Sequence, residues 1–169
     1  MARQTTPERV KVLLCGIYGN ETVKNSRIIL LTGSKKSFSD IDLFSSSDYL
    51  SSIKNNWLDM VVFDTEDFER RVGLFEIQVT HPIISGEFIA GDKNYLEQKR
   101  KQLQEQQITE EAIQYNIKKS EQEKIASKET KDTKLKELFH SYSKTYLMNA
   151  LALKQGLRLF TQENLILYS

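Results

Sequence analysis

Cysteine and proline are scarce in this sequence. Cys15 is the one cysteine, which excludes an internal disulfide framework and any cysteine-rich zinc site. Proline occurs only at Pro7 and Pro82, and after residue 93 the single glycine is Gly156. Because helix breakers are so rare there, we expect the C-terminal part of the chain to be helical.

An excess of charge of one sign is also absent. Lys plus Arg is 24 against 23 for Asp plus Glu, and the net charge of +1 argues against a protein that coats a long polyanion. No apolar run approaches the roughly 20 residues that span a bilayer, and the first residues lack the apolar core of a signal peptide. We therefore expect a cytoplasmic protein with no membrane segment, whose partner is a small molecule or a protein rather than a nucleic acid.

The composition changes near residue 93. Before this point, short apolar runs are broken by Gly, Ser, Asn and Asp, which is typical of a sheet combined with helices. After it, Lys, Glu and Gln dominate, which favours helices. We therefore expect an α+β or α/β N-terminal part followed by an all-helical C-terminal part.

Apolar patterns place the elements of the N-terminal part. A helix is expected from Pro7, with Thr6 as its N-cap, to a stop at Gly19, because the apolar residues between them recur at helical spacing. Further runs of strand length predict four strands, at residues 27–32, 39–44, 57–63 and 74–80, and the first of them is expected to be buried on both faces. Residues 82–91 are expected to form a loop and a short strand.

Capping residues divide the C-terminal part into helices. Asp92 is a good N-cap for a helix that ends near residue 107. A solvated helical stretch rich in Gln, Lys and Glu continues to a break at residues 128–131. Asp132 or Thr133 then caps a long amphipathic helix, whose apolar stripe we interpret as packing surface.

Two aspartates share one face of a predicted strand. Asp40 and Asp42 are two residues apart, and their mutual repulsion costs stability unless a cation lies between them. Asp59 lies inside the next apolar strand, where a lone carboxylate breaks the usual pattern, and Glu76 is a weaker candidate for this third acid. Three converging carboxylates are what hard divalent ions need, so these aspartates predict a site for two Mg²⁺ ions.

Phosphate-binding groups are expected beside these acids. The first predicted strand ends at Gly33-Ser34, a turn that offers backbone N–H donors and a hydroxyl to phosphate oxygens. Lys35 and Lys36 add positive charge next to this turn.

Taken in order, these motifs resemble the nucleotidyltransferases of the DNA polymerase β superfamily. That family has an apolar strand, a Gly-Ser pair, an Asp-x-Asp motif and a third acid on a later apolar strand. The matching residues here are Gly33-Ser34, Asp40-Ile-Asp42 and Asp59. The resemblance covers roughly residues 8–107, and the helical tail matches only in character.

The resemblance implies an α+β fold, with a mixed-sheet catalytic domain in residues 1–107 and a helical C-terminal region in residues 108–169. It implies transfer of a nucleoside monophosphate from an NTP to a hydroxyl acceptor, either a small molecule such as an aminoglycoside-like antibiotic or a protein side chain. Asp40, Asp42 and Asp59 would hold two Mg²⁺ ions, and Asp59 would help to activate the hydroxyl. The nucleotide contacts would come from Gly33, Ser34, Lys35, Lys36 and Ser39.

The loop between the Gly-Ser pair and the first aspartate departs from the family pattern. It holds five residues, 35–39, where family members usually have enough for a helical turn. Either Lys35 or Lys36 covers the triphosphate charge in place of the longer loop, or nucleotide binding is weakened or lost.

An alternative without catalysis therefore stays open. The same fold could serve as an interaction module, with the long helices and the apolar tail mediating self-association. The tail, Leu165-Ile-Leu-Tyr168, is expected to be buried against the helical region or against a second copy.

Overall fold

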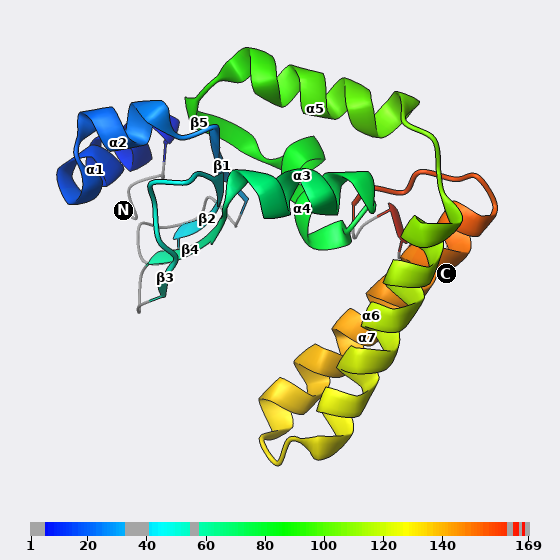
Figure 1. Ribbon diagram of the computed structural model, residues 1–169. Helices are drawn as coiled ribbons and strands as arrows, with labels where there is room; N and C mark the ends of the chain where they lie inside the picture. Colours follow the sequence, from blue (N-terminus) through cyan, green and yellow to red (C-terminus); the bar gives the residue numbers. More distant parts are fainter. Residues whose placement is uncertain (1–5, 33–40, 55–57, 162–163, 166, 168–169) are drawn as a thin grey trace. The chain divides into compact units, whose positions relative to one another are not determined.

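The computed structural model describes residues 6–32, 41–54, 58–161, 164–165 and 167, and for Ile41 and Asp42 it describes the backbone only. Helices and strands are mixed in the first part of the chain, and helices alone follow after β5 (Figure 1). In chain order these elements are α1 (Pro7–Tyr18), α2 (Asn20–Asn25), β1 (Ile28–Leu31), β2 (Ile41–Ser46), β3 (Ile53–Lys54), β4 (Leu58–Phe63), α3 (Thr65–Gly73), α4 (Ile77–Ser85), β5 (Glu87–Gly91), α5 (Lys93–Glu105), α6 (Glu110–Glu129) and α7 (Thr133–Lys154). The fold is α+β with an all-helical C-terminal region, as the sequence predicts.

The chain forms two compact units. The first, called here the sheet unit, comprises Met1–Arg70 and Pro82–Lys101. The second, called here the helical unit, comprises Arg71–His81 and Gln102–Ser169. A short segment from the middle of the N-terminal part thus belongs to the same compact unit as the C-terminal helices.

The sheet unit contains a mixed sheet with the strand order β3-β4-β2-β1-β5. Strand β1 is antiparallel to both of its neighbours, β2 and β4 are parallel, and β3 is antiparallel to β4. All four residues of β1 are buried, which confirms the prediction of a strand covered on both faces. The predicted strands at 39–44 and 57–63 correspond to β2 and β4.

Helices α1 and α2 cover one face of this sheet. Val10 and Leu14 of α1 are buried in one apolar cluster with Ile29, Leu43 and Met60 from three strands. Pro7 occupies the start of α1, as expected, and Gly19 ends it with a φ of +87°, a conformation that favours glycine.

Aromatic rings connect the opposite face of the sheet to α3 and α5. The ring of Phe44 lies 5.9 Å from that of Phe68, which lies 6.2 Å from that of Tyr95. Asp92 caps α5, because its Oδ1 accepts hydrogen bonds from the backbone N–H groups of Asn94 and Tyr95. The cap predicted at this position is confirmed.

The strand predicted over residues 74–80 is wrong. Leu74–Glu76 form a turn, in which Phe75 has a φ of +52°, and α4 begins at Ile77 and runs to Ser85. Helix α4 therefore also takes up the first four residues of the segment expected to be loop and short strand, and only β5 remains of it. The cause is the pattern itself, since a short apolar run fits a buried helix as well as a strand.

Helices α6 and α7 form the main part of the helical unit. Serines join them along their length: the Oγ of Ser120 donates to the carbonyl of Ser143, and the Oγ of Ser127 donates to that of Lys136. The break predicted near 128–131 is present between the two helices. Asp132 caps α7 by accepting from the N–H of Leu135.

The apolar tail is divided in its environment. Leu165 is buried in a cluster with Ile77, Tyr146 and Ala152 of the helical unit. Leu167 is 85% exposed in the single chain, so the helical unit does not bury it, and burial against a second copy stays a prediction. The other two tail residues lie outside the described part.

Within the described residues, no helix combines the length and the apolar character that a membrane crossing requires.

Candidate functional site

Two of the predicted acids are backbone partners in the sheet. Strands β2 and β4 are parallel, and their register places Asp42 directly opposite Asp59. Positions that face each other across two strands share one face of a sheet and lie about 5 Å apart. The structure therefore brings together two acids that are separated by sixteen residues in the sequence.

A lysine extends this pair into a row of three charged residues. Strand β3 is antiparallel to β4, and Lys54 is the backbone partner of Asp59. The Nζ of Lys54 lies 3.4 Å from the Oδ2 of Asp59. Lys54, Asp59 and Asp42 thus occupy one row across three neighbouring strands, and we refer to these three residues as the charged row.

The charged row lies where several strands begin or end. Leu31, the last residue of β1, pairs with Leu43 of β2, so the chain leaves β1 beside the start of β2. The chain then continues toward Gly33, the first residue of the predicted phosphate-binding turn. The remaining predicted residues, Gly33, Ser34, Lys35, Lys36, Ser39 and Asp40, lie outside the described residues, as does the side chain of Asp42.

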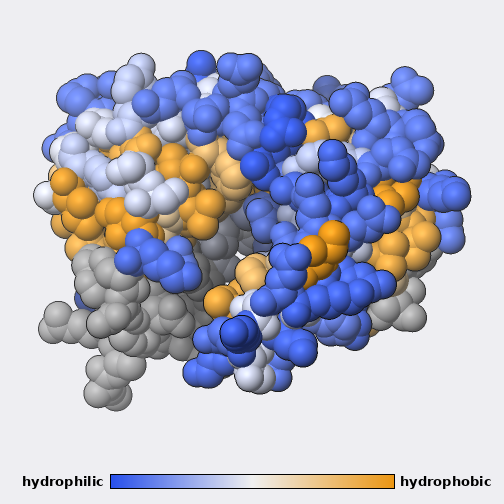
Figure 2. All heavy atoms as spheres, turned by 60° about the horizontal axis from the view of Figure 1, so that its bottom comes forward, coloured by the Kyte–Doolittle hydropathy of each residue, from blue (hydrophilic) through white to orange (hydrophobic). Residues whose placement is uncertain are grey.

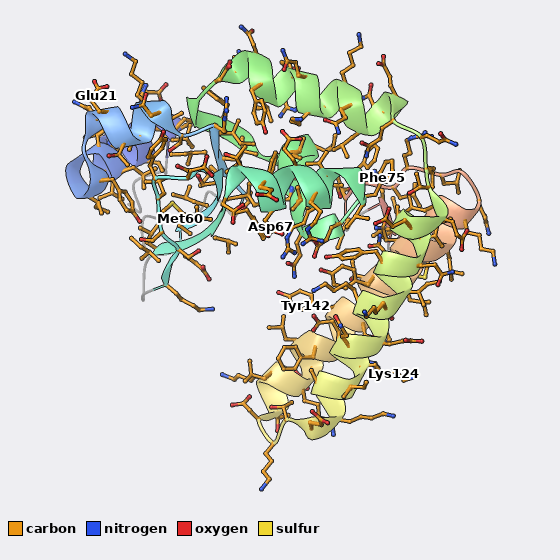
Figure 3. All side chains as sticks on the ribbon, viewed as in Figure 1. Glu21, Met60, Asp67, Phe75, Lys124 and Tyr142 are labelled. Carbon is orange, nitrogen blue, oxygen red and sulfur yellow. The ribbon has the colours of Figure 1, made fainter. Side chains whose placement is uncertain are left out.

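Asp59 projects from the more open face of β4. Leu58 and Met60, on either side of it, are buried in the core under α1, and Figure 3 labels Met60 within the sheet. Val61, two residues along the same face, is 45% exposed. The side chain of Asp59 itself is 40% exposed, so a ligand can reach its carboxylate from solvent.

The described residues alone do not complete a metal centre. Among them, no three His, Cys, Asp or Glu side chains gather closely enough to hold an ion. Asp59 is the only one of the three predicted ligands whose side chain is described. What is in place is the backbone pairing of two carboxylate-bearing residues, which supply the hard oxygen donors that Mg²⁺ prefers.

Lys54 is the site residue that sequence analysis missed. A lysine beside serines and asparagines is typical of any exposed loop, and only the strand register reveals its partner. The available signal was the Asn55-Asn56 pair, which is typical of a tight turn between two short strands.

A surface depression lined by charged residues lies at the opposite end of β1 and β2. It is lined by residues before β1, after β2 and before α5, including Lys24, Arg27, Asp48 and Asp92. Asp48 accepts hydrogen bonds from the backbone N–H and the hydroxyl of Thr65, which lower the pKa of its carboxyl below the usual value. Asp92 caps α5, so both carboxylates already serve helix starts.

Glu69 and Tyr95 form a third polar group, on α3 and α5 of the sheet unit. The hydroxyl of Tyr95 donates to Glu69, whose other oxygen accepts from the Nζ of Lys99 at 2.6 Å. Burial and this hydrogen bond raise the pKa of Tyr95 above its ordinary value, so the phenol stays protonated. Because each group here has a partner, we interpret the arrangement as a connection between two helices.

Glu76, the weaker candidate for the third acid, belongs to the helical unit. It is completely buried, and its carboxylate accepts hydrogen bonds from Arg71, Tyr115 and Tyr146. Burial, and then the charge of Glu76, raise the pKa of Tyr146. With both oxygens occupied by protein donors, Glu76 is a structural residue of the helical unit.

Comparisons with known proteins find similarity among solved structures alone. No protein-family model matches this chain, and no curated protein matches it. Among solved structures, it is similar to a nucleotidyltransferase-like protein from Exiguobacterium sibiricum 255-15, with a TM-score of 0.45 and 12% sequence identity over 88% of this chain. This chain spans 59% of the length of that protein. At this distance the likeness says nothing about the activity of this chain.

Proposed function

We propose that this chain is an Mg²⁺-dependent nucleotidyltransferase that moves a nucleoside monophosphate from an NTP to a hydroxyl group. The observation that carries the proposal is the parallel pairing of β2 with β4, which makes Asp42 and Asp59 backbone partners. Two acids placed side by side repel each other, and a shared divalent cation removes that repulsion. Asp59 is not part of the buried core on the α1 side of the sheet.

The donor set fits Mg²⁺. Asp40, Asp42 and Asp59 offer carboxylate oxygens only, and Asp59 is exposed enough to exchange water for a ligand. We assign metal binding to these three residues. Once bound, Mg²⁺ supplies Lewis-acid stabilisation of the phosphate charge and of the pyrophosphate that leaves.

Asp59 has a second role in this proposal. Its carboxylate orients the acceptor hydroxyl and accepts its proton as the oxygen attacks the α-phosphorus. The bond to the pyrophosphate breaks on the far side of the phosphorus atom, so that the attacking and leaving oxygens are in line. Asp59 can take this part because it belongs to the more open face of β4, where an acceptor has access to it.

The nucleotide contacts are assigned to the loop after β1. Gly33, Ser34 and Ser39 offer backbone N–H groups and hydroxyls to the β- and γ-phosphates, and Lys35 and Lys36 neutralise their charge. The strand register supports this assignment, because the end of β1 is next to the start of β2 and so to Asp42.

We propose a small molecule or a protein side chain as the acceptor. A net charge of +1 gives the chain little attraction for a long nucleic acid. An aminoglycoside-like antibiotic is one acceptor of the right chemistry, since it carries hydroxyls together with positive charge that suits an acidic site.

A second candidate function is a non-catalytic interaction module. Leucines on α7 favour it, because Leu135, Leu138, Leu147 and Leu151 are each more than 40% exposed. Figure 2 shows hydrophobic patches among the hydrophilic side chains of one face of the molecule. In this alternative the charged row binds no nucleotide and the long helices mediate self-association.

Turnover separates the two candidates. The full chain is incubated with Mg²⁺, each of the four NTPs in turn and panels of aminoglycoside and protein acceptors, and pyrophosphate release is measured. The proposal predicts release that depends on Mg²⁺ and disappears in Asp42→Asn and in Asp59→Asn. Asp67→Asn is the matched control, since Asp67 is an acid on α3 that pairs with Arg70 (Figure 3). Release that survives both site variants would assign the chemistry elsewhere.

A further inference from the structure

Lys54 belongs to an edge strand beside the proposed metal site. Strand β3 has two residues and lies at the margin of the sheet, with β4 as its only neighbour in the strand order. Register alone places Lys54 next to Asp59, and Asp59 next to Asp42. Across the strands, the charged row therefore consists of a cationic residue, Lys54, followed by two acidic residues, Asp59 and Asp42.

The ion pair between Lys54 and Asp59 is easily opened. The side chain of Lys54 is 85% exposed and that of Asp59 is 40% exposed. Exposed pairs of this kind contribute little to stability, because water screens them and the long side chain loses freedom when it is held. Lys54 can therefore leave Asp59 at small cost.

A divalent cation and the ammonium group compete for the same carboxylate. The Nζ of Lys54 is 3.4 Å from an oxygen that the metal ion would use. Two cations cannot both lie against one exposed carboxylate without repelling each other. Binding of the ion to Asp59 thus releases the ammonium group at the edge of the site.

We propose that Lys54 exchanges partners during nucleotide binding, from Asp59 in the metal-free protein to a phosphate oxygen of the NTP once Mg²⁺ is bound. This inference rests on the proposed function and adds a positioning residue to it. The released ammonium group is on a flexible stem with three donors, and the triphosphate is the nearest concentration of negative charge once the acids are occupied. Lys54 then shields the acids when the site is empty and holds the substrate when it is full.

A purely structural reading gives Lys54 a different role. Charged residues, lysine above all, protect edge strands from pairing with another chain. In that reading Lys54→Gln changes neither metal affinity nor nucleotide affinity, since only the edge of the sheet is affected. The two readings are therefore separable by binding measurements, with no need for turnover.

The test compares Lys54→Gln with wild type in two titrations of the full chain. Mn²⁺ alone is followed by electron paramagnetic resonance, and ATP, CTP, GTP and UTP are each titrated calorimetrically in the presence of Mg²⁺ and without acceptor. Lys54→Gln is expected to bind Mn²⁺ about two- to fivefold more tightly, because the competing ammonium group is gone. It is expected to bind the preferred Mg²⁺-nucleotide about tenfold more weakly, because one charge-assisted hydrogen bond is lost.

Two further variants make these results specific. Lys54→Arg keeps the charge and should retain nucleotide affinity within about threefold. Lys11→Gln removes the same charge from an exposed position on α1 and should match wild type in both titrations.

Each outcome decides the proposal. Tighter Mn²⁺ binding together with weaker nucleotide binding supports the exchange. If either affinity is unchanged in Lys54→Gln, or if Mn²⁺ binds more weakly, the exchange is overturned. The proposed function is not affected by these results. If wild type binds none of the four Mg²⁺-nucleotides, the proposed function fails first and the exchange fails with it.

Discussion

The carboxylates of the two units differ in burial and in hydrogen bonding. In the helical unit, Glu76 is completely buried, and donors from Arg71, Tyr115 and Tyr146 occupy both of its oxygens. A carboxylate that is fully buried and surrounded by three protein donors is closed to a ligand from solvent. Its charge is compensated by the guanidinium of Arg71, so removal of Arg71 would leave a buried charge without compensation. Removal of either tyrosine hydroxyl would cost one hydrogen bond.

Among the described side chains of the sheet unit, Asp59 has no such shell of donors. Asp59 is 40% exposed, and the cation beside it is an 85% exposed lysine. Its backbone partner on the other side is a second aspartate, Asp42. The comparison teaches that burial alone does not identify a functional acid. A carboxylate that the protein leaves accessible beside a like charge is the better candidate.

The largest expected effect is on catalysis. Asp59→Asn should lower the transfer rate by a factor on the order of 10³, because it removes both a metal ligand and the base. The free energy of unfolding of the metal-free protein should change by less than about 0.5 kcal/mol, since the group is exposed. Pyrophosphate release and urea unfolding measure the two quantities. A large loss of stability would place Asp59 in the same class as Glu76 and break the comparison.

Glu76→Ala should have a large effect on stability, in contrast to Asp59→Asn. The substitution removes the acceptor that a guanidinium and two tyrosine hydroxyls share, and should lower the free energy of unfolding by about 3 kcal/mol. Urea unfolding measures this loss, and Glu97→Ala, which removes the acid of an exposed pair on α5, should cost less than about 1 kcal/mol. Glu76→Gln keeps the shape and provides a variant for measurement if alanine prevents folding. Equal costs at Glu76 and Glu97 would contradict the structural role.

A smaller effect is expected at Tyr146, which is 1% exposed and donates to Glu76 at 2.9 Å. Tyr146→Phe should reduce the free energy of unfolding by about 1.5 kcal/mol, because one oxygen of a buried carboxylate loses its donor. Tyr142→Phe is the matched control from the preceding turn of α7, because Tyr142 packs against the apolar cluster that contains Tyr146 and is not among the donors found on Glu76. Figure 3 labels Tyr142 on this helix. If both tyrosines gave the same loss, the hydrogen bond to Glu76 would not be its cause.

The smallest expected effect concerns Asp48. Hydrogen bonds from Thr65 lower its pKa from an ordinary value of 3.8, so the unfolded chain takes up this proton more readily than the folded chain. The contribution to stability is therefore complete above about pH 4 and is lost as the pH falls through the lowered pKa. Unfolding temperatures measured from about pH 5 to about pH 3 should fall less steeply in Asp48→Asn than in wild type. Identical slopes would show that the hydrogen bonds to Thr65 do not persist in solution.

Much of the sheet unit was predictable because its strands carry clear patterns. The apolar run of β1 indicated a strand buried on both faces, and Pro7 and Asp92 marked helix starts that the structure confirms. The run at 74–80 was misread because seven apolar-rich residues fit either type of element. Its conformation is decided by contacts far along the chain, such as the side-chain amide of Asn149, which donates to the carbonyl of Phe75.

The candidate site was predictable only in part, for a related reason. Asp42 and Asp59 were identifiable from single-residue departures within apolar strands, a local signal. Their pairing depends on strand order and register, which the sequence shows only indirectly. The Asn55-Asn56 pair that follows Lys54 is typical of a turn between two strands, but only the strand register shows that Lys54 lies beside Asp59.

Paramagnetic broadening by Mn²⁺ tests most directly whether the charged row holds the metal ion and its nucleotide. Amide resonances of the full chain are recorded while substoichiometric Mn²⁺ is added in the presence of ATP. The account predicts that the amides of Asp42 and Asp59 broaden first, and that those of Ser46 and Phe63, about 13 Å further along the same strands, broaden later. Broadening centred on Asp64–Asp67, or spread evenly over the chain, would contradict the account.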